Sequence, residues 1–194
     1  MPDLRKRLED ALAQTGSASS DFDLNADVKK PDAVLTPAAV LIGIRAETKT
    51  VILTKRSARL KHHPGQIAFP GGKKDPTDDT LVDAALREAS EEIGLPPLIV
   101  DVLGELPPHQ TVTGYQVTPV VGLIDGHYDP VAEQGEVSEI FEVPLTHLVD
   151  ARNYLIEGRR WQGRRRLYYT VPFGPYYIWG ATARILRAFA ERMT

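Results

Sequence analysis

The chain has 194 residues, of which 42% are hydrophobic and 25% charged, and its formal net charge is −3. These values are typical of one globular domain with a sizeable core, and the negative charge argues against a domain-wide surface for nucleic acid. The absence of cysteine excludes disulfides, zinc–thiolate sites and thiol nucleophiles. No apolar run approaches the roughly 18 residues of a membrane span, and the N-terminus lacks the apolar stretch of a signal peptide. We therefore expect a cytoplasmic protein.

The N-terminal part divides into two segments. Leu4, Leu8, Ala11 and Leu12 recur at helical spacing and predict a short amphipathic helix. Residues 13–31 are polar and poor in large apolar residues, which is typical of a linker or an irregular surface segment. We therefore predict an N-terminal helix and polar linker over 1–31 and one main domain over 32–194.

The next segments are rich in β-forming residues. Residues 38–46 and 50–56 are separated by a short polar turn and predict a hairpin. Residues 65–72, GQIAFPGG, predict a short strand that ends in a turn at Pro70, Gly71 and Gly72. Further expected elements are strands over 98–106, 115–124 and 139–145, a helical turn over 147–150, a hairpin with its turn at 158–163, and a helix over 181–193. Many strands with two substantial helices predict a mixed α/β domain.

A helix is expected between 80 and 93. Asp79 or Thr80 can cap its start, Gly94 suits its C-terminal cap, and the prolines at 96 and 97 prevent its continuation. We expect its apolar stripe to face the core, on the side away from its glutamates. The stripe consists of Val82, Leu86, Ala89 and Ile93.

Three glutamates lie together on this helix. Glu91 and Glu92 follow Glu88 by three and four residues, so all three carboxylates share about a third of the helix circumference. By itself such a cluster is also typical of a solvated acidic face. Here a glycine-rich turn leads directly into the helix, and carboxylates are hard oxygen donors suited to Mg²⁺ or Mn²⁺. This setting favours a metal site that acts on phosphates.

The stretch 87–95, REASEEIGL, resembles the box of the Nudix hydrolases. That box is a glycine turn followed by Arg-Glu-apolar-x-Glu-Glu-x-Gly-apolar, and Arg87 to Leu95 fill it in order. The front half departs from the pattern, since one extra residue lies between Gly72 and Asp79, the acidic position eight residues before Arg87.

Residues 53–78 are similar to the additional signature of the coenzyme A pyrophosphatase branch of this family, LLTxRSxxLxxHxGQxxFPGGxxDPxD. The extended turn of that signature accounts for the extra residue, and IWGATARIL at 178–186 also looks like this branch. The matching positions are Thr54, Arg56, Ser57, Leu60, His63, Gly65, Gln66, Phe69, Pro70, Gly71, Gly72, Asp75, Pro76 and Asp78.

The resemblance implies a Nudix fold, an α/β/α sandwich around a mixed β-sheet. It also implies metal-dependent attack of water on the diphosphate of coenzyme A, giving 4′-phosphopantetheine and adenosine 3′,5′-bisphosphate, with Mg²⁺ or Mn²⁺ as cofactor. Another nucleoside diphosphate, such as ADP-ribose or a dinucleotide, is an open alternative. A non-catalytic nucleotide sensor is a further one, although such domains typically lose box glutamates. The expected partner is a small-molecule substrate, without nucleic acid or membrane, and the oligomeric state stays open.

Roles at the metal site follow from the box. Glu88 and Glu92 are the first candidates for direct metal ligands because they lie one turn apart, and Glu91 is either a third ligand or the base that activates water. Arg87 is expected to clamp a glutamate rather than to contact substrate. In several Nudix enzymes the base comes from a separate loop. Candidates for such a base, each otherwise an ordinary solvated charge, are Glu133, Glu136 and Glu139.

The signature also supplies substrate-binding candidates. Cations suited to phosphate cluster before Gly65, of which Arg56 and His63 lie in the signature, whereas Lys61 and His62 are as well explained as surface residues. Phe69 fits a substrate cleft and core packing equally. The expected substrate-binding residues are Arg56, His63, Gln66, Phe69, Gly71 and Gly72.

A second basic run covers 159–166, RRWQGRRR. A basic run with an aromatic residue is found in single-strand nucleic-acid binders, but this run spans a predicted turn in an acidic protein, so a solvated turn is favoured. A contact with the 3′-phosphate of coenzyme A is a further hypothesis. Trp179 is expected to pack under the last helix.

Overall fold

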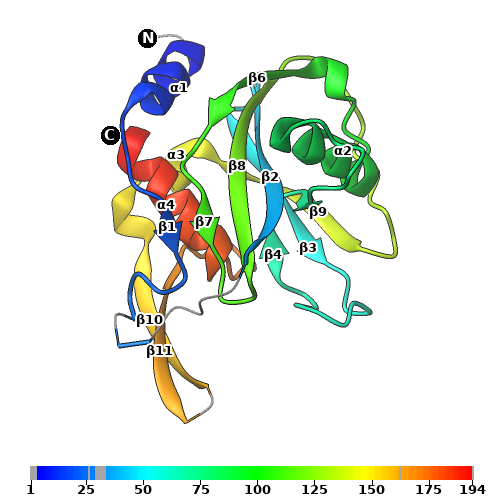
Figure 1. Cartoon of the computed structure of the whole chain (residues 1–194). Helices are drawn as coiled ribbons and strands as arrows, with labels where there is room; N and C mark the ends of the chain where they lie inside the picture. The colour runs from blue at the N-terminus through cyan, green and yellow to red at the C-terminus, as the bar shows by residue number, and fades with distance from the viewer. Residues whose placement is uncertain (1–3, 26, 29–33, 162, 194) are drawn as a thin grey trace.

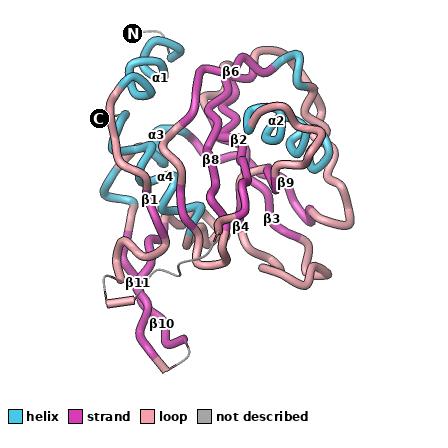
Figure 2. Tube along the Cα trace, viewed as in Figure 1, coloured by secondary structure: helices cyan, strands magenta, loops and turns pink. Residues whose placement is uncertain are grey.

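The computed structural model describes residues 4–25, 27–28, 34–161 and 163–193. Within these ranges nine strands form one mixed sheet, two more form a separate hairpin, and helices cover both faces of the sheet (Figure 1). Figure 2 shows the strands between α2 on one side and α1, α3 and α4 on the other. The predicted α/β/α sandwich around a mixed sheet is therefore confirmed. No helix in the described ranges is long and apolar enough to cross a membrane.

The predicted helices and strands are largely present. The helices are α1 Leu4–Ala13, α2 Leu81–Ile93, α3 Leu145–Leu148 and α4 Ala181–Met193, with short 3₁₀ turns at Pro97–Ile99 and Ala151–Asn153. The strands are β1 Ser19–Ser20, β2 Thr36–Arg45, β3 Thr50–Arg56, β4 Ile67–Ala68, β5 Gly71–Lys73, β6 Val100–Glu105, β7 His109–Gln110, β8 Tyr115–Ile124, β9 Val137–Pro144, β10 Leu155–Trp161 and β11 Arg164–Thr170.

Strand β2 is the centre of the sheet. It pairs in parallel with β8 along its whole length, although about 70 residues separate the two in sequence. The expected hairpin with β3 is present, but only its last two residues pair across the turn. The rest of that edge is occupied by β5, in which Gly71 pairs with Val40 and Gly72 with Ala39. The predicted turn at 70–72 is therefore wrong, because these glycines form a strand that enters the sheet.

The alternation of side chains across the sheet explains its two cores. Leu41 and Ile52 pack on the side of α2, whereas Ile42 and Leu53 pack on the side of α1, α3 and α4. All four side chains are at most 1% exposed. Strands buried on both faces read as continuous apolar runs, which is why residues 38–46 lack the polar alternation of a surface strand.

The N-terminal segment is part of the domain. Helix α1 is confirmed, with Leu8 buried against the α4 side of the core. The prediction of a linker is wrong for residues 19–25, because β1 pairs with β7 and the buried His109 lies between Ser19 and Asp21, at 2.9 and 3.1 Å. The boundary at residue 31 stays a prediction, since 26 and 29–33 lie outside the described residues.

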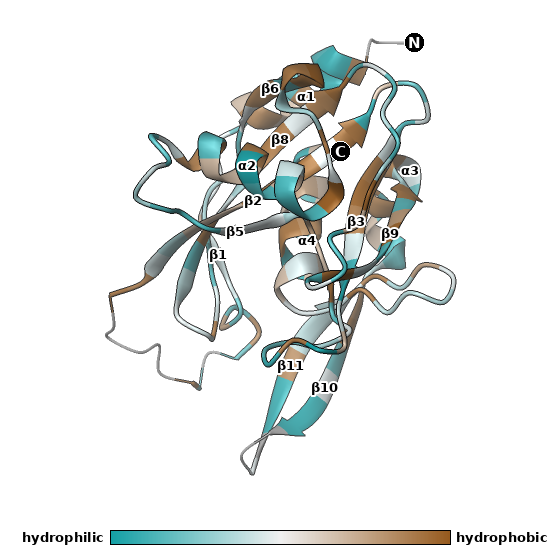
Figure 3. Ribbon diagram, turned by 90° about the vertical axis from the view of Figure 1, so that its right-hand side faces the viewer, coloured by the Kyte–Doolittle hydropathy of each residue, from teal (hydrophilic) through white to brown (hydrophobic). Residues whose placement is uncertain are grey.

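The β10–β11 hairpin is confirmed, with a shorter turn than predicted because its strands extend to Trp161 and from Arg164. It projects from the body of the molecule (Figure 1), and Figure 3 shows that much of it is hydrophilic. Asn25, which is 6% exposed, ties the hairpin to the N-terminal segment. Its amide donates to Leu167 O at 2.9 Å and accepts from Leu167 N at 2.8 Å.

Candidate functional site

Helix α2 begins and ends where local chemistry requires. Thr80 is the N-cap, and its side chain accepts from Asp83 N while the Asp83 carboxylate accepts from Thr80 N, forming a capping box. Gly94 adopts the left-handed conformation, with φ of 67°, and closes the C-terminus. Both caps agree with the sequence, which left Thr80 and Asp79 open as alternatives. The helix therefore has a fixed length and register, which fixes the direction of its glutamates.

The buried face of α2 differs from the predicted stripe. Ala84, Ala85, Ala89 and Ile93 are fully buried, and Glu92 lies among them with only 4% of its surface exposed. The expectation that all the glutamates lie away from the core is therefore wrong for Glu92. Alanines at 84 and 85 let the helix approach the sheet closely, and this approach places the Glu92 carboxylate under β5.

Two glycines of β5 make room for the carboxylates. A side chain at Gly72 would place its Cβ 2.4 Å from Glu88 Oε1, a distance that no real contact shows. Gly71, with φ of 155°, donates its backbone N–H to Glu92 Oε2 at 3.3 Å. Gly71 has a backbone angle that favours glycine, whereas a side chain at position 72 would displace the carboxylate of Glu88 from its place. Backbone groups of β5 therefore lie directly against the two carboxylates.

Arg87 holds the carboxylates in place, as predicted for a clamp. It donates to Glu88 Oε1 at 3.0 Å and to Glu91 Oε2 at 3.1 Å, and it also donates to Lys73 O at 3.1 Å. Its strongest partner is Asp78, which accepts from Nε and Nη2 at 3.0 Å each. This bidentate pair raises the pKa of Arg87 and lowers the pKa of Asp78.

Sequence reasoning missed Asp78 as the partner of Arg87. Asp78 is 6% exposed, whereas Asp79, which has the spacing of the Nudix pattern, is exposed. The side chain of Asp78 also accepts from Asp75 N at 2.8 Å, so it braces the turn as well as the arginine. The extra residue in the turn shifts the buried acidic position by one. The signature DPxD ends on Asp78, and it could have identified Asp78 rather than Asp79 as this position.

Burial shifts the acidity of two glutamates. It raises the pKa of Glu92 to about 7, and the neighbouring charge of Glu88 adds to this. It also raises the pKa of Glu88, although Arg87 opposes the shift. Arg56 lowers the pKa of Glu92, whereas Glu136 raises the pKa of both glutamates. The site therefore concentrates negative charge in a region shielded from water.

These residues fit a divalent cation. Glu92 is a buried carboxylate whose raised pKa shows that its charge lacks sufficient compensation, and a cation next to Glu92 and Glu88 would provide it. Their oxygens are the hard donors that Mg²⁺ and Mn²⁺ prefer. No group of three or more His, Asp or Glu side chains in the described part of the chain forms a ready-made cage, and Arg87 engages Glu88 and Glu91 instead. Ligand roles for Glu88, Glu91 and Glu92 stay predictions.

The loop before β9 approaches the C-terminal end of α2. Glu133 N donates to Glu92 O at 2.9 Å, and Glu136 O accepts from Ser57 N at 2.7 Å. The loop is therefore fixed both to α2 and to the segment 53–78 that carries the signature. Glu139 lies further along in β9, opposite Lys55, and accepts a hydrogen bond from Tyr176. Of the three loop candidates, Glu136 is therefore the one with evident electrostatic contact with the glutamates.

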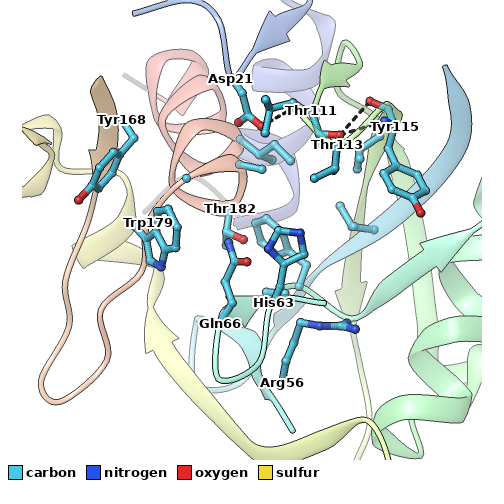
Figure 4. Close-up of a pocket in the computed structure, with 18 of the residues that line it drawn as sticks. Asp21, Arg56, His63, Gln66, Thr111, Thr113, Tyr115, Tyr168, Trp179 and Thr182 are labelled. Atoms are coloured by element: carbon cyan, nitrogen blue, oxygen red, sulfur yellow. Dashed lines mark hydrogen bonds between the residues drawn. The ribbon is translucent and has the colours of Figure 1, made fainter. Parts of the chain in front are cut away.

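The three glutamates at 88, 91 and 92, with Arg87, form a glutamate platform on α2. A cavity of about 750 Å³ opens beside this platform. Val40, which pairs with Gly71, lies in its wall, and so does Arg56, whose charge acts on Glu92. The signature residues Arg56, His63, Gln66 and Phe69 all line it, and Figure 4 shows His63 and Gln66 near its centre.

The aromatic residues Phe69 and Trp179 both line the cavity. Phe69 is 3% exposed and belongs to the core, and it also lines the cavity, so core packing is confirmed and a role in substrate binding stays a prediction. Trp179 lines the cavity, as do Thr182 and Ile185 of α4, and its ring centroid lies 5.3 Å from that of Tyr168. The expected packing of Trp179 under the last helix stays a prediction. Lys61 and His62 are exposed, as expected for surface residues.

The fold, the capped helix and its glutamate platform define a class. A family model described as NUDIX domain matches residues 34–164, and the chain belongs to the Nudix hydrolase family. Nudix hydrolases generally use divalent metal ions, which agrees with the carboxylates described above.

Similar proteins carry the same family name. A protein named Uncharacterized Nudix hydrolase NudL from Enterobacter sp. (strain 638) is 45% identical over 156 residues, covering 79% of this chain and 80% of the relative. Its counterpart of the same name from Pectobacterium atrosepticum is 46% identical over 159 residues, covering 81% and 82%. These names give the family and no substrate.

Solved structures of Nudix proteins also align. The MutT protein of Methanosarcina mazei Go1 has a TM-score of 0.49 and 21% identity, covering 62% of this chain and 84% of that chain. A binary complex of the C. elegans Ap4A hydrolase has a TM-score of 0.48 and 19% identity, covering 56% and 80%. At these values neither likeness bears on the substrate.

Proposed function

We propose that this Nudix hydrolase cleaves the diphosphate of coenzyme A and its derivatives, giving 4′-phosphopantetheine and adenosine 3′,5′-bisphosphate, with Mg²⁺ or Mn²⁺. The main support is that Arg56, His63 and Gln66, which lie in the signature of the coenzyme A branch, line one cavity beside the glutamate platform. Its volume of about 750 Å³ suits a ligand larger than a simple nucleotide. A cytoplasmic location stays a prediction.

The charges of the site support reaction at a diphosphate. A divalent cation held by Glu88 and Glu92 would neutralise the diphosphate oxygens and polarise the bond that breaks. Arg87 keeps the carboxylates of Glu88 and Glu91 in a fixed direction. Arg56 stands between platform and cavity and supplies a positive charge to the same diphosphate.

A carboxylate must accept the proton of the attacking water. Glu139 and Glu91 are the sequence candidates for this role, together with Glu133 and Glu136. We favour Glu136, because its charge acts on both Glu88 and Glu92 and its backbone is fixed to Ser57. The hydrogen bond that Glu139 accepts from Tyr176, whose ring is stacked on Phe141 with centroids 3.6 Å apart, favours a structural role for Glu139.

Hydrolysis in ¹⁸O-labelled water tests the proposal. The protein is incubated with coenzyme A, ADP-ribose or a dinucleotide in the presence of Mg²⁺ or Mn²⁺, and the products are identified by mass spectrometry. We expect coenzyme A to be the best substrate, with one ¹⁸O on one of its two products. Faster turnover of ADP-ribose or a dinucleotide would overturn the substrate assignment. Tight binding of a nucleotide without turnover of any substrate would identify a sensor instead.

A further inference from the structure

The basic hairpin forms part of the cavity that holds the signature residues. Arg159 and Arg166 line this cavity, together with Tyr168 and Trp179. The basic run therefore has a different setting from the solvated turn expected from sequence. Gln162 and the side chains of Trp161 and Arg164 lie outside the described part of the run.

The pairing register separates the arginines into two faces. Arg159 lies opposite Arg166, and Arg160 lies opposite Arg165. Opposed residues share one face of a hairpin, and their neighbours point to the other face. The pair 159 and 166 therefore faces the cavity, whereas the pair 160 and 165 faces away from it.

Aromatic rings lie beside the inward arginine pair. The guanidinium of Arg159 lies 5.6 Å from the ring centroid of Trp179, and the edge of Tyr168 meets the same ring. Both rings are partly exposed toward the cavity, so their surfaces are accessible to a planar ligand group. A pair of arginines next to accessible aromatic side chains is the chemistry that recognises a base and its attached phosphate.

This group is separate from the cations at the platform. Figure 4 shows Tyr168 and Trp179 on one side of the cavity and Arg56 on the other, with Gln66 and His63 between them. The cavity therefore presents positive charge at two places. A ligand that satisfies both carries a diphosphate at one end and a second phosphate at a distance from it.

We infer that Arg159 and Arg166, with Trp179 and Tyr168, form a subsite for a nucleoside that carries a phosphate monoester apart from the scissile diphosphate. In coenzyme A this group is the 3′-phosphate of the adenosine, so the inference rests on the proposed function and assigns its specificity. Asn25 fixes the subsite, because its amide holds both backbone groups of Leu167, the residue between Arg166 and Tyr168.

Binding of nucleotides to the metal-free protein tests the subsite without catalysis. Isothermal titration calorimetry at low salt compares adenosine 3′,5′-bisphosphate with adenosine 5′-monophosphate, which lacks the second phosphate. The wild type should bind the bisphosphate about 10-fold more tightly, the value of one or two charge-assisted hydrogen bonds. The R159Q/R166Q variant should lose this preference, and Arg159→Gln alone should weaken it if the double variant does not fold.

The matched control is R160Q/R165Q, which removes the same charge from the outer face of the same hairpin and should keep the preference. An equal loss in both double variants would mean general attraction of anions, and it would overturn the subsite. A preference retained by R159Q/R166Q, or none in the wild type, would also overturn it. Coenzyme A hydrolysis is measured separately. If coenzyme A is not cleaved although the preference depends on Arg159 and Arg166, the proposed function fails and the subsite stands.

Discussion

The glutamate platform lies beside the cavity and the basic hairpin forms part of its wall, and the two charge clusters are held in opposite ways. In the platform, Glu92 is buried, the carboxylate of Glu88 lies against the backbone of Gly72, and Arg87 holds the neighbouring carboxylates. In the hairpin, Arg159 is exposed and the two strands project from the body. The burial of one cluster creates a strong local field that suits a small cation. The exposure of Arg159 leaves its guanidinium accessible from solvent.

A metal site and a subsite that recognises a ligand have different structural requirements. A metal site gains from desolvation, because the interaction of each carboxylate with the cation increases as water is excluded. A subsite for a large ligand gains from access, and its arginines can be replaced without disturbing the core. Substitutions in the platform should therefore abolish turnover, whereas substitutions in the hairpin should change which ligand is preferred.

The largest expected effect is at Glu92. Replacing Glu92 by Gln keeps its size but removes a charge from the platform, so kcat should fall at least about 10³-fold and the affinity for Mn²⁺ should decrease. Steady-state kinetics and metal titration measure both quantities. Glu105→Gln, an exposed change on β6, is the control. If E92Q keeps the kinetics and the metal affinity of the wild type, the platform has no part in the mechanism.

The second effect separates Glu136 from Glu139. If Glu136 accepts the proton of water, Glu136→Gln should lower kcat about 10²-fold with little change in KM. Glu139→Gln should have a smaller effect, since that carboxylate is engaged by Tyr176. Comparing pH profiles of kcat for the two variants decides the assignment, and a larger loss in E139Q would reverse it.

The third effect concerns the clamp. Asp78→Asn removes the charge that Arg87 binds most strongly, so we expect a loss of about 2–3 kcal/mol in the free energy of unfolding and about a 10-fold lower kcat. Asp79→Asn, one residue away and exposed, should change neither quantity. Chemical denaturation and kinetics compare the two variants. Equal effects at 78 and 79 would contradict the assignment of the buried carboxylate.

The pH dependence of stability reports on the same burial. In the metal-free protein the pKa of Glu92 is about 7, above the value of about 4.3 in an unfolded chain. The folded state therefore favours the protonated carboxyl, and this stabilisation is complete below about pH 4 and lost as the pH rises through 7. Between about pH 4 and 8 the wild type should lose about 3–4 kcal/mol of unfolding free energy relative to Glu92→Gln. Chemical denaturation in the presence of EDTA measures the unfolding free energy of both proteins as a function of pH. The prediction is contradicted if the two proteins show the same dependence on pH.

The smallest effect lies in the hairpin. Asn25→Ala removes both hydrogen bonds to Leu167 and should reduce the stability of the hairpin by about 1–2 kcal/mol. Amide hydrogen exchange along β11 should accelerate while exchange in α2 stays unchanged. Asp27→Asn, an exposed neighbour, is the control. Faster exchange in α2 would mean that hairpin and platform are not independent.

The platform was largely predictable because its residues are contiguous in sequence. Helical spacing brings Glu88, Glu91 and Glu92 together, and Gly94 and Thr80 cap the helix by local rules. The depth of Glu92 was not predictable, since it depends on how closely the alanines at 84 and 85 bring the helix to the sheet. Likewise, the path of one turn decides whether Asp78 or Asp79 is buried, and their side chains are identical.

The hairpin side of the cavity was less accessible to sequence reasoning. Asn25, Arg159 and Trp179 come from three distant segments, and only the tertiary fold brings them together. A polar stretch such as 19–25 has the composition of a linker, because its contacts are hydrogen bonds rather than apolar packing. The strand pairing shows which arginines face the cavity, whereas the run RRWQGRRR alone does not show which of its arginines share a face.

The N-terminal segment and the residues after β11 both lie outside the family match at 34–164, yet Asp21, Asn25, Trp179 and Thr182 line the cavity. The two chain ends therefore pack on the shared Nudix unit and contact each other, since Arg184 of α4 pairs with Asp23 at 2.9 Å. A protein trimmed to the shared unit would lose Leu8 from its core and part of the cavity wall, whereas α2 and its glutamates would be retained. Exchanging both ends together between relatives is thus a way to graft a new ligand preference onto an unchanged reaction centre.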